Sequence, residues 1–395
     1  MREGWKYKKL KDVASLITDG DWIESRHQSE SGIRLIQTGN VGNGIFKAKD
    51  DKPHYISEDT FLELGCTEIF RGDCLVSRLP EPVGRACIIP EVGCRMITAV
   101  DCTIIRFKDC VLPKLFVYYT RSKQYKREID NSTTGTTRKR ISRKNLESVS
   151  IPLLPVDEQN KIVAELDLLT EIINKQKQQL KELDTLAQSI FYDMFGNPVD
   201  NEKGWKTCRL ESIIQVKGRV GWKGYKKEDL RDSGALAIGG GHLTNSGEID
   251  LSEPVYLSME KYEESPEIMI ETGDLILVQR GTIGKVGLVR TDIGQATINP
   301  CVLILRPKTI NNVYALHFFL NSNMQEHLKT LIRGVAQPMI TQQQVNSLCV
   351  PIPPSEQQEV FAQRVQAIES QKQSINRSIA ESQKLFDYTM DKYFG

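Results

Sequence analysis

The feature that most constrains this chain is a long helix with heptad periodicity in the middle of the sequence, over residues 157–195. Its apolar residues recur alternately four and three positions apart, which places them on one helix face and is typical of a coiled-coil seam. At about 1.5 Å rise per residue the helix is roughly 55–60 Å long, more than the core of one compact domain requires. The seam positions are Ile162, Leu166, Leu169, Ile173, Gln176, Leu180, Leu183, Ala187, Ile190 and Met194.

A second heptad helix of the same length ends the chain, over residues 355–395. We predict that the two helices pair with each other and hold two modules apart; the alternative is that each packs only against its own domain. Gln176, Lys372 and Ser382 interrupt the seams, where they cost stability and help to fix register. Lys372 is further expected to mark where the second helix faces a partner subunit. The residues predicted to pair are Ile162, Leu166, Leu169, Ile173, Leu180, Leu183 and Ile190 with Phe361, Val365, Ile368, Ile375, Ile379 and Phe386.

Length and composition bound the class of protein. A chain of 395 residues suits two or three domains, and 39% hydrophobic with 26% charged residues is typical of ordinary globular cores and surfaces. The formal net charge of +1 argues neither for nor against nucleic acid, so the distribution of charge must decide.

Cysteine usage and the N-terminal residues indicate the compartment. The nine cysteines are an odd number and form no Cys-x-x-Cys pair, which argues against a zinc site or a disulfide framework. The first residues lack an apolar signal core, and no apolar run approaches the roughly 20 residues of a membrane helix. We predict a cytoplasmic protein without membrane contact and without a bound metal.

The chain is written twice, with a period of about 200 residues. The segment 4–6, Gly-Trp-Lys, returns at 204–206, and Gly72-Asp73 returns as Gly273-Asp274. We match the loop from Arg78 to Arg85 with the loop from Arg280 to Lys285. The proline-rich stretch 151–155 and the following Asp-Glu-Gln return at 350–358, each time opening a heptad helix.

Each module has mixed secondary structure, so the predicted fold class is α+β. Short β-branched runs at 33–36, 102–107, 275–278 and 297–305 predict strands, and 112–129 and 313–332 predict helices. The predicted domains are a first module at 1–155, a first helix at 156–196, a linker at 197–203, a second module at 204–354 and a second helix at 355–395.

No catalytic constellation is evident in the sequence. Gly239-Gly240-Gly241 lacks the spacing of a phosphate-binding loop, and the five histidines are scattered without ligand spacing. The pattern favours a binding protein over an enzyme.

The strongest local signal is a basic segment at residues 121–144, with nine Lys or Arg against two acids. Its centre combines hydroxyls, a glycine and guanidinium groups, which can contact phosphates and the edges of guanine. The alternative is a solvated basic surface. The residues predicted to bind DNA here are Thr136, Thr137, Arg138, Lys139, Arg140 and Arg143.

The matching stretch of the second module is rich in amides, and glutamine pairs naturally with adenine. Modules with a shared scaffold and different side chains suit two different half-sequences. Two further pairs of polar, basic loops are candidates, although ordinary turns would look the same. The DNA-binding residues predicted from these features are Gln337, Gln342 and Gln343, then Arg78 and Arg85 with Arg280, Thr282 and Lys285, then Arg26 and His27 with Lys223 and Lys226.

The order of these elements and their duplication resemble the specificity (S) subunit of type I restriction–modification systems. The resemblance spans the whole chain: a module, an Ile-Pro-Leu-Leu-Pro exit, Asp-Glu-Gln, a long helix, a Phe-Gly-Asn-Pro stop, and all of it again. It implies two target recognition domains, and conserved spacer helices that pair as an antiparallel coiled coil. Such a subunit is not an enzyme.

The resemblance also implies partners and a function. The chain would read a bipartite, asymmetric sequence in double-stranded DNA. It would recruit two modification subunits that bind S-adenosylmethionine and methylate adenine, and in the full complex two restriction subunits that use ATP and Mg²⁺. No cofactor is expected on this chain itself. The alternative function is a coiled-coil adaptor that joins proteins without reading DNA.

Overall fold

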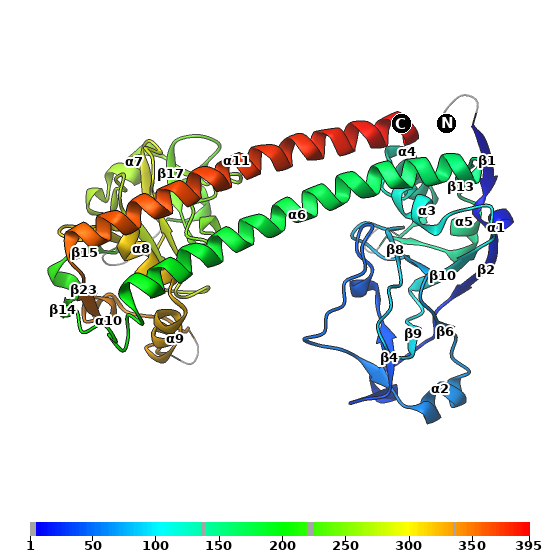
Figure 1. The fold of residues 1–395 in the computed structure, drawn as a ribbon, viewed down its shortest axis with the longest axis horizontal. Coiled ribbons are helices and arrows are strands. Elements are labelled where there is room, and N and C mark those ends of the chain that lie inside the picture. The colour runs from blue at the N-terminus through cyan, green and yellow to red at the C-terminus, as the bar shows by residue number, and fades with distance from the viewer. Residues whose placement is uncertain (1–4, 136–138, 220–224, 335–336) are drawn as a thin grey trace. The chain divides into compact units, whose positions relative to one another are not determined.

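Residues 5–135, 139–219, 225–334 and 337–395 are described by a computed structural model of the chain, drawn in Figure 1. Contacts divide the chain into two compact units, Met1–Lys175 with Ser378–Gly395, and Gln176–Arg377. Each unit therefore contains one globular module and a part of both long helices. The domain boundaries inferred from sequence, which end each module where its helix begins, remain a prediction.

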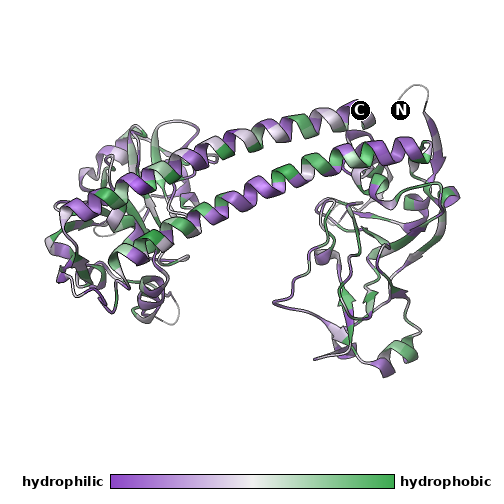
Figure 2. Cartoon of the chain, viewed as in Figure 1, coloured by the Kyte–Doolittle hydropathy of each residue, from purple (hydrophilic) through white to green (hydrophobic). Residues whose placement is uncertain are grey.

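The two long helices are α6 (Val156–Phe195) and α11 (Ser355–Phe394), within one or two residues of the predicted bounds. In the first unit the Tyr393 hydroxyl near the end of α11 donates to Glu165 Oε2 near the start of α6, at 2.6 Å. In the second unit the rings of Phe191 and Phe361 lie 5.6 Å apart, so that the end of α6 meets the start of α11. Within each unit the two helices thus run antiparallel, and apolar and polar residues alternate along both (Figure 2).

The helices pair with each other and also pack against the modules, so both arrangements considered from the sequence hold in part. The first core contains Leu166 of α6, Met390 of α11 and strands of the first module. The second contains Phe191, Phe361 and strands of the second module. Near the end of α6 the fully buried positions are Phe191 and Phe195, while Ile190 is half-buried, because both phenylalanine rings pack on Tyr314.

The predicted seam residues differ in depth. The fully buried ones are Ile162, Leu166, Leu169, Ile173, Phe361, Val365, Ile368 and Phe386. The half-buried ones are Leu180, Leu183, Ile190, Ile375 and Ile379.

Lys372 does not face outward, contrary to the expectation that it meets a partner subunit. Its residue is only 5% exposed, and its ammonium group lies 2.9 Å from Asp184 of α6, 3.2 Å from Glu369 and 3.4 Å from Glu248. Burial lowers the pKa of Lys372, but the hydrogen bond to Asp184 and the three carboxylates outweigh it and raise the pKa overall. A lysine is tolerated in this seam because acids surround it.

The modules are built on the same four-stranded antiparallel sheet, which confirms the internal repeat. In the first module the order is β2 (Ala14–Asp19), β10 (Cys102–Phe107), β7 (Cys74–Ser77) and β8 (Ala86–Ile88). In the second it is β15 (Ile214–Lys217), β22 (Val302–Pro307), β19 (Leu275–Val278) and β20 (Val286–Leu288).

A second sheet and a strand pair complete each module. The second sheets are β3 (Gln28–Ser29), β5 (Tyr55–Ile56), β4 (Ile33–Ile36), β9 (Met96–Thr98) and β6 (Glu68–Ile69), and β16 (Leu230–Arg231), β18 (Tyr256–Leu257), β17 (Ala235–Ile238) and β21 (Ala296–Ile298). The pairs are β1 (Lys6–Lys9) with β13 (Ser150–Leu153), and β14 (Lys206–Arg209) with β23 (Cys349–Ile352). The first module adds a hairpin of β11 (Thr133–Thr134) and β12 (Arg140–Ile141).

Three segments that were each predicted as one continuous element are divided into two elements in the structure. The run 297–305 contains the end of β21 and most of β22, because Asn299 Oδ1 accepts from the Cys301 amide and turns the chain. The helical stretches break where Ser122 and Asn321 cap a new helix. The shorter helices are α1 (Leu10–Val13), α2 (Glu58–Leu64), α3 (Pro113–Tyr119), α4 (Lys123–Ser132) and α5 (Arg143–Glu147), then α7 (Met259–Glu263), α8 (Asn312–Leu320), α9 (Ser322–Thr330) and α10 (Gln342–Asn346).

A buried glutamine fixes each long helix to the module before it. Gln159 Oε1 accepts from the Leu112 amide at 2.8 Å, and its Nε2 donates to the carbonyls of Cys110 and Leu154. Gln358 accepts from the Asn311 amide at 2.9 Å in the same way. This pairing shows why glutamine closes the repeated motif at the start of both helices.

Candidate nucleic-acid interface

Segments far apart in the first module meet at one edge of its four-stranded sheet. The Arg78 amide, just after β7, donates to the Asp101 carbonyl at 2.9 Å, and the Ile141 amide of β12 donates to the Arg78 carbonyl at 3.2 Å. Asp19 ends β2, and Arg143 begins α5. The predicted DNA-binding residues Arg78, Arg140 and Arg143 are therefore brought together.

Two aspartates lie within ion-pair distance of these three guanidinium groups. Arg78 Nη1 lies 3.2 Å and Arg143 Nη1 lies 4.0 Å from Asp19 Oδ2, while Arg140 Nη2 lies 2.9 Å from Asp101 Oδ1. We refer to these five residues as the arginine–aspartate cluster. Arg143 Nε also lies 3.4 Å from Glu147 Oε1, so the three arginines face three carboxylates and their charges balance.

The cluster is graded in depth. Arg78 lies at its base, buried, and donates from Nη2 to the Val100 carbonyl. Burial lowers the pKa of Arg78; Asp19 and Asp101 act against this, and Arg140 and Arg143 add to it. The side chains of Arg140 and Arg143 are 45% and 47% exposed, so their guanidinium groups can reach a ligand.

The second module repeats the backbone of this site. The Gln279 amide donates to the Cys301 carbonyl at 2.9 Å, and the Ile340 amide donates to the Gln279 carbonyl at 3.1 Å. Gln279, and not Arg280, is therefore the counterpart of Arg78, which corrects the loop match made from sequence. The loop between β7 and β8 is one residue longer than the loop between β19 and β20. The sequence match of Arg78 with Arg280 did not allow for this difference.

The side chains of the second site are neutral. Strand registers and backbone hydrogen bonds place Gly218, Gln279, Cys301, Met339 and Gln342 at the positions of the arginine–aspartate cluster. Gln342 Nε2 donates to the Val216 carbonyl at 2.9 Å, and Arg280 reaches Met339 Sδ at 3.7 Å. The predicted residues Thr282, Gln337 and Gln343 are exposed.

Two further predicted DNA-binding residues, Arg85 and Lys285, also bond to backbone carbonyls of their modules. Arg85 is buried and donates to the carbonyls of Thr38, Val41, Leu79 and Pro82. These bonds fix the loop and occupy Nε, Nη1 and Nη2 of Arg85. The half-buried counterpart, Lys285, donates to the Leu243 carbonyl at 3.3 Å.

The remaining predicted residues lie apart from the cluster contacts or outside the described residues. Arg26 pairs with Glu24 at 2.9 Å, and His27 Nδ1 accepts from the Glu24 amide. Lys226 pairs with Glu228 at 3.4 Å, and Lys139 is exposed. Thr136, Thr137, Arg138 and Lys223 lie outside the described residues.

Sequence reasoning missed Asp19 and Asp101 as partners of the arginines. Both stand where a polar residue ends or precedes a buried strand, a signal that marks a sheet edge. Which arginine each would meet depends on the pairing of distant strands.

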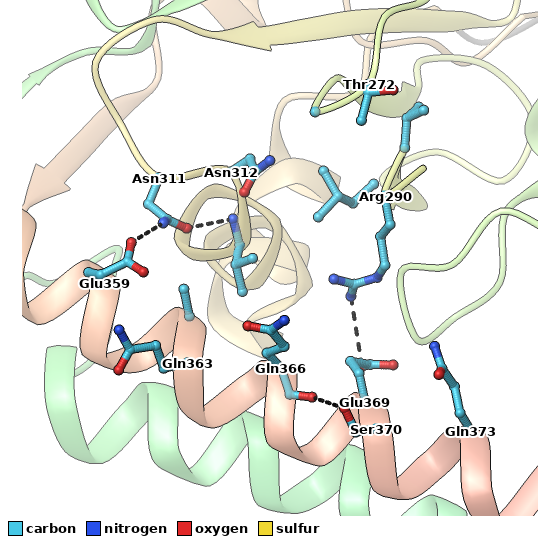
Figure 3. Close-up of a pocket in the computed structure, with 15 residues that line it drawn as sticks. Thr272, Arg290, Asn311, Asn312, Glu359, Gln363, Gln366, Glu369, Ser370 and Gln373 are labelled. Atoms are coloured by element: carbon cyan, nitrogen blue, oxygen red, sulfur yellow. Dashed lines mark hydrogen bonds and ion pairs between the residues drawn. The ribbon is translucent and has the colours of Figure 1, made fainter. Parts of the chain in front are cut away.

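A polar groove of about 600 Å³ lies in the second unit between α11 and its module (Figure 3). Gln363, Gln366 and Gln373 line one wall, and Arg290 lies 3.7 Å from Glu369. The described residues contain no group of three His, Cys, Asp or Glu side chains that could hold a metal ion. Within the same described ranges, no helix is long and apolar enough to cross a membrane.

Comparison with protein-family models gives two matches in one chain. The model described as the type I restriction modification DNA specificity domain matches residues 2–183 and again residues 202–382. The two matches fall on the two halves of the internal repeat.

Three specificity subunits align with this chain over different shares of their own length. The EcoKI specificity subunit of Escherichia coli (strain K12) is 20% identical, with 99% of this chain and 89% of that subunit aligned. The putative MjaX specificity subunit of Methanocaldococcus jannaschii is 20% identical over 93% of this chain and 87% of that protein. The alignment with the MjaVIII specificity subunit of the same organism, at 22% identity, spans only 65% of that subunit and 67% of this chain.

Solved structures support the same fold. A chain from a study of complex assembly and conformational transition of the type I R-M system aligns with a TM-score of 0.58 at 18% identity, over 100% of this chain and 98% of the other. The S subunit from M. genitalium aligns with a TM-score of 0.53 at 14% identity, again over 100% and 98%.

Proposed function

The chain belongs to the family of type I restriction modification DNA specificity domains, and from this premise we propose that it recognises a bipartite, asymmetric DNA sequence through its two modules. Members of this family supply DNA recognition to a restriction–modification complex, so methyl transfer and cleavage belong to partner subunits. We propose two modification subunits, which bind S-adenosylmethionine, and two restriction subunits with ATP and Mg²⁺.

One observation carries the bipartite target: two equivalent sites share a backbone and differ in their side chains. The same two backbone hydrogen bonds form around Arg78 and around Gln279. The first site presents guanidinium groups, which suit guanine, and the second presents amides, which suit adenine. Two different readout surfaces on one scaffold imply two different half-sequences.

The chain itself contributes little net charge to DNA binding. Its formal net charge is +1, and protein–DNA affinity depends largely on neutralised phosphates. Partner subunits therefore supply much of the phosphate contact, which supports recognition within a complex rather than by the isolated chain.

The test is single-molecule methylation sequencing of DNA from a host that expresses this chain with an adenine modification subunit. We expect one recurrent bipartite motif, methylated on both strands. If no motif rises above background and mixed subunits give no DNA gel shift, the proposal fails and the adaptor function takes its place.

A second experiment tests whether the helices set the gap in the target. Deleting residues 176–182 and 375–381 removes one heptad from each helix and keeps both seams in register. We expect the number of unspecified base pairs to change while both half-sites stay the same. An unchanged gap in the methylome of this variant would show that the helices are not the ruler.

A further inference from the structure

The strongest unexplained feature is the pair of carboxylates in the arginine–aspartate cluster. A carboxylate at a DNA-binding surface repels phosphates and lowers affinity, so its presence requires a reason. Asp101 nonetheless lies 2.9 Å from Arg140, and Asp19 lies 4.0 Å from Arg143, which also pairs with Glu147 at 3.4 Å. The two carboxylates therefore lower the affinity for DNA but hold two long side chains in a defined orientation.

We propose that Asp19 and Asp101 are positioning residues that aim Arg143 and Arg140 at guanine bases in the first half-site. The assignment rests on the proposed function, because it names the residues by which the first module would read its DNA. Arg78 is also a positioning residue, since it is buried and pairs with Asp19 at 3.2 Å.

The geometry around Arg140 is fixed at both ends of the side chain. Its neighbour Ile141 is buried and hydrogen-bonded to the Arg78 carbonyl, which fixes the backbone. At the other end of the side chain, Arg140 Nη2 lies 2.9 Å from Asp101 Oδ1, which restricts where the guanidinium group can lie. Arginine carries five N–H donors, so other N–H groups are left for the O6 and N7 acceptors of guanine. A guanidinium held in advance loses less side-chain entropy on binding.

The second module shows that the fold does not require these charges. It forms the same backbone hydrogen bonds around Gln279 with five neutral residues in place of the cluster. Gly218 replaces Asp19, and a Cβ there would lie 2.7 Å from Leu303 Cδ2 and 3.4 Å from Gln342 Oε1. In the second module, Leu303 and Gln342 therefore border the space that the Asp19 side chain occupies in the first.

A contribution to folding stability does not explain the Arg140–Asp101 pair. Its side chains are 45% and 30% exposed, and exposed ion pairs contribute little to folding. Variants at these positions are expected to fold, so their DNA discrimination can be measured directly.

The test uses the full chain assembled with its modification subunit, and duplexes in which each base pair of the first half-site is changed in turn. In Arg140→Gln and Arg140→Lys, we expect discrimination at one guanine position to fall by roughly 5- to 150-fold, with the second half-site unaffected. The lysine variant keeps the charge, so its binding to unrelated DNA should stay near that of the wild type.

Asp101→Asn separates positioning from a merely structural role. We expect discrimination at the same base pair to fall while affinity for unrelated DNA stays equal or rises, because one negative charge is lost. Glu58→Gln is the matched control: it removes one acid from an exposed pair with Arg95, at 2.7 Å in the same unit, and should change neither quantity.

Three results would overturn the assignment. Unchanged discrimination in Arg140→Gln would remove Arg140 as a base reader, and a uniform loss across all sequences with a shallower salt dependence would make it a phosphate contact. A loss of both affinity and discrimination in Asp101→Asn would make Asp101 structural. Absence of any bipartite motif with the wild-type chain would instead overturn the proposed function, and the assignment with it.

Discussion

Isoleucine occupies position 173 in the helix seam of the first unit, whereas lysine occupies the equivalent position 372 in the second. Both side chains are buried. Ile173 lies in the apolar core of the first unit, while Lys372 contacts Asp184, Glu248 and Glu369. The same backbone position thus accepts either residue, provided that the surrounding residues match it.

The equivalent sheet edges of the two modules show the same principle, but here the first unit carries the charges. The first module has the arginine–aspartate cluster, and the second has five neutral residues on the same backbone. Neither unit is simply the more charged one: the first places its charges at the sheet edge, and the second places them in the helix seam. In each unit, the charged residues pair with residues of that same unit.

Phe191→Ala should give the largest difference between the units. The Phe191 ring packs against Phe195, Tyr314 and Phe361, and its loss leaves a cavity that costs the second unit about 3–5 kcal/mol. Hydrogen exchange should accelerate in the second unit and stay unchanged in the first. Leu186→Ala, 46% exposed on the same helix, is the control and should cost less than about 0.5 kcal/mol. Equal acceleration in both units would show that they do not unfold separately.

Ile173→Lys tests whether the first unit tolerates the second unit's lysine. The new ammonium group would be buried without its acids, which should cost the first unit roughly 2–4 kcal/mol. By the repeat, Gln383 corresponds to Asp184, so adding Gln383→Asp should restore part of the loss. Urea unfolding of the single and double variants measures this coupling. If the effects of the two substitutions on the free energy of unfolding simply add, the lysine–aspartate pair of the second unit cannot be transferred to the first.

Acid should destabilise the second unit through His317. Burial first, then Arg290 and Lys372, lower the pKa of His317 to about 3, and its ring stacks near Phe191. The unfolded chain binds a proton below about pH 6.5 and the folded unit does not, so stability is complete above that pH. It falls by about 1.4 kcal/mol per pH unit between about 6.5 and 3. The counterpart in the first unit is Tyr118, whose hydroxyl donates to Asp167 at 2.6 Å.

His317→Phe should remove this part of the acid sensitivity. Urea unfolding at pH 7 and at pH 5.5, for the wild type and the variant, measures the difference. An identical loss in both proteins would assign the acid sensitivity to other groups.

Lys372→Ile, which copies the first unit, should give the smallest effect. The variant leaves the facing acids without the ammonium group. Because Asp184 and Glu248 are 38% and 42% exposed and Glu369 keeps Arg290 at 3.7 Å, we expect a loss within about 1.5 kcal/mol. The measurement is the thermal midpoint of the second unit, compared with Lys372→Ala, which leaves the same acids and adds a cavity. A large loss in the isoleucine variant would mean that the charge network stabilises the helix pair more than packing does.

The sequence predicted the local elements closely where a periodic pattern or a turn residue marks them. The heptad spacing located α6 and α11 to within one or two residues, and β4, β10 and β19 were predicted with their observed ends. It failed where a single cap divides a continuous pattern, as at Ser122, and where Asn299 turns the chain. Such breaks depend on one side chain and leave periodicity almost unchanged.

The candidate site was predicted only in part. Arg140 and Arg143 were selected from the basic segment and Arg78 from a repeated loop, and the three do meet. The same loop gave Arg85 equal standing although it bonds to backbone carbonyls. Asp19 and Asp101 carried no signal of their pairing, because an ion pair depends on which strands lie side by side.

By itself, then, the sequence determined that this protein has two similar modules and two long helices, because heptads and repeats are written in neighbouring residues. Only the tertiary structure decided that each unit takes part of both helices, that Lys372 lies buried among acids, and which arginines the carboxylates hold. These outcomes join residues distant in the chain. Their energies come from burial and short contacts that exist only once the strands and helices have packed.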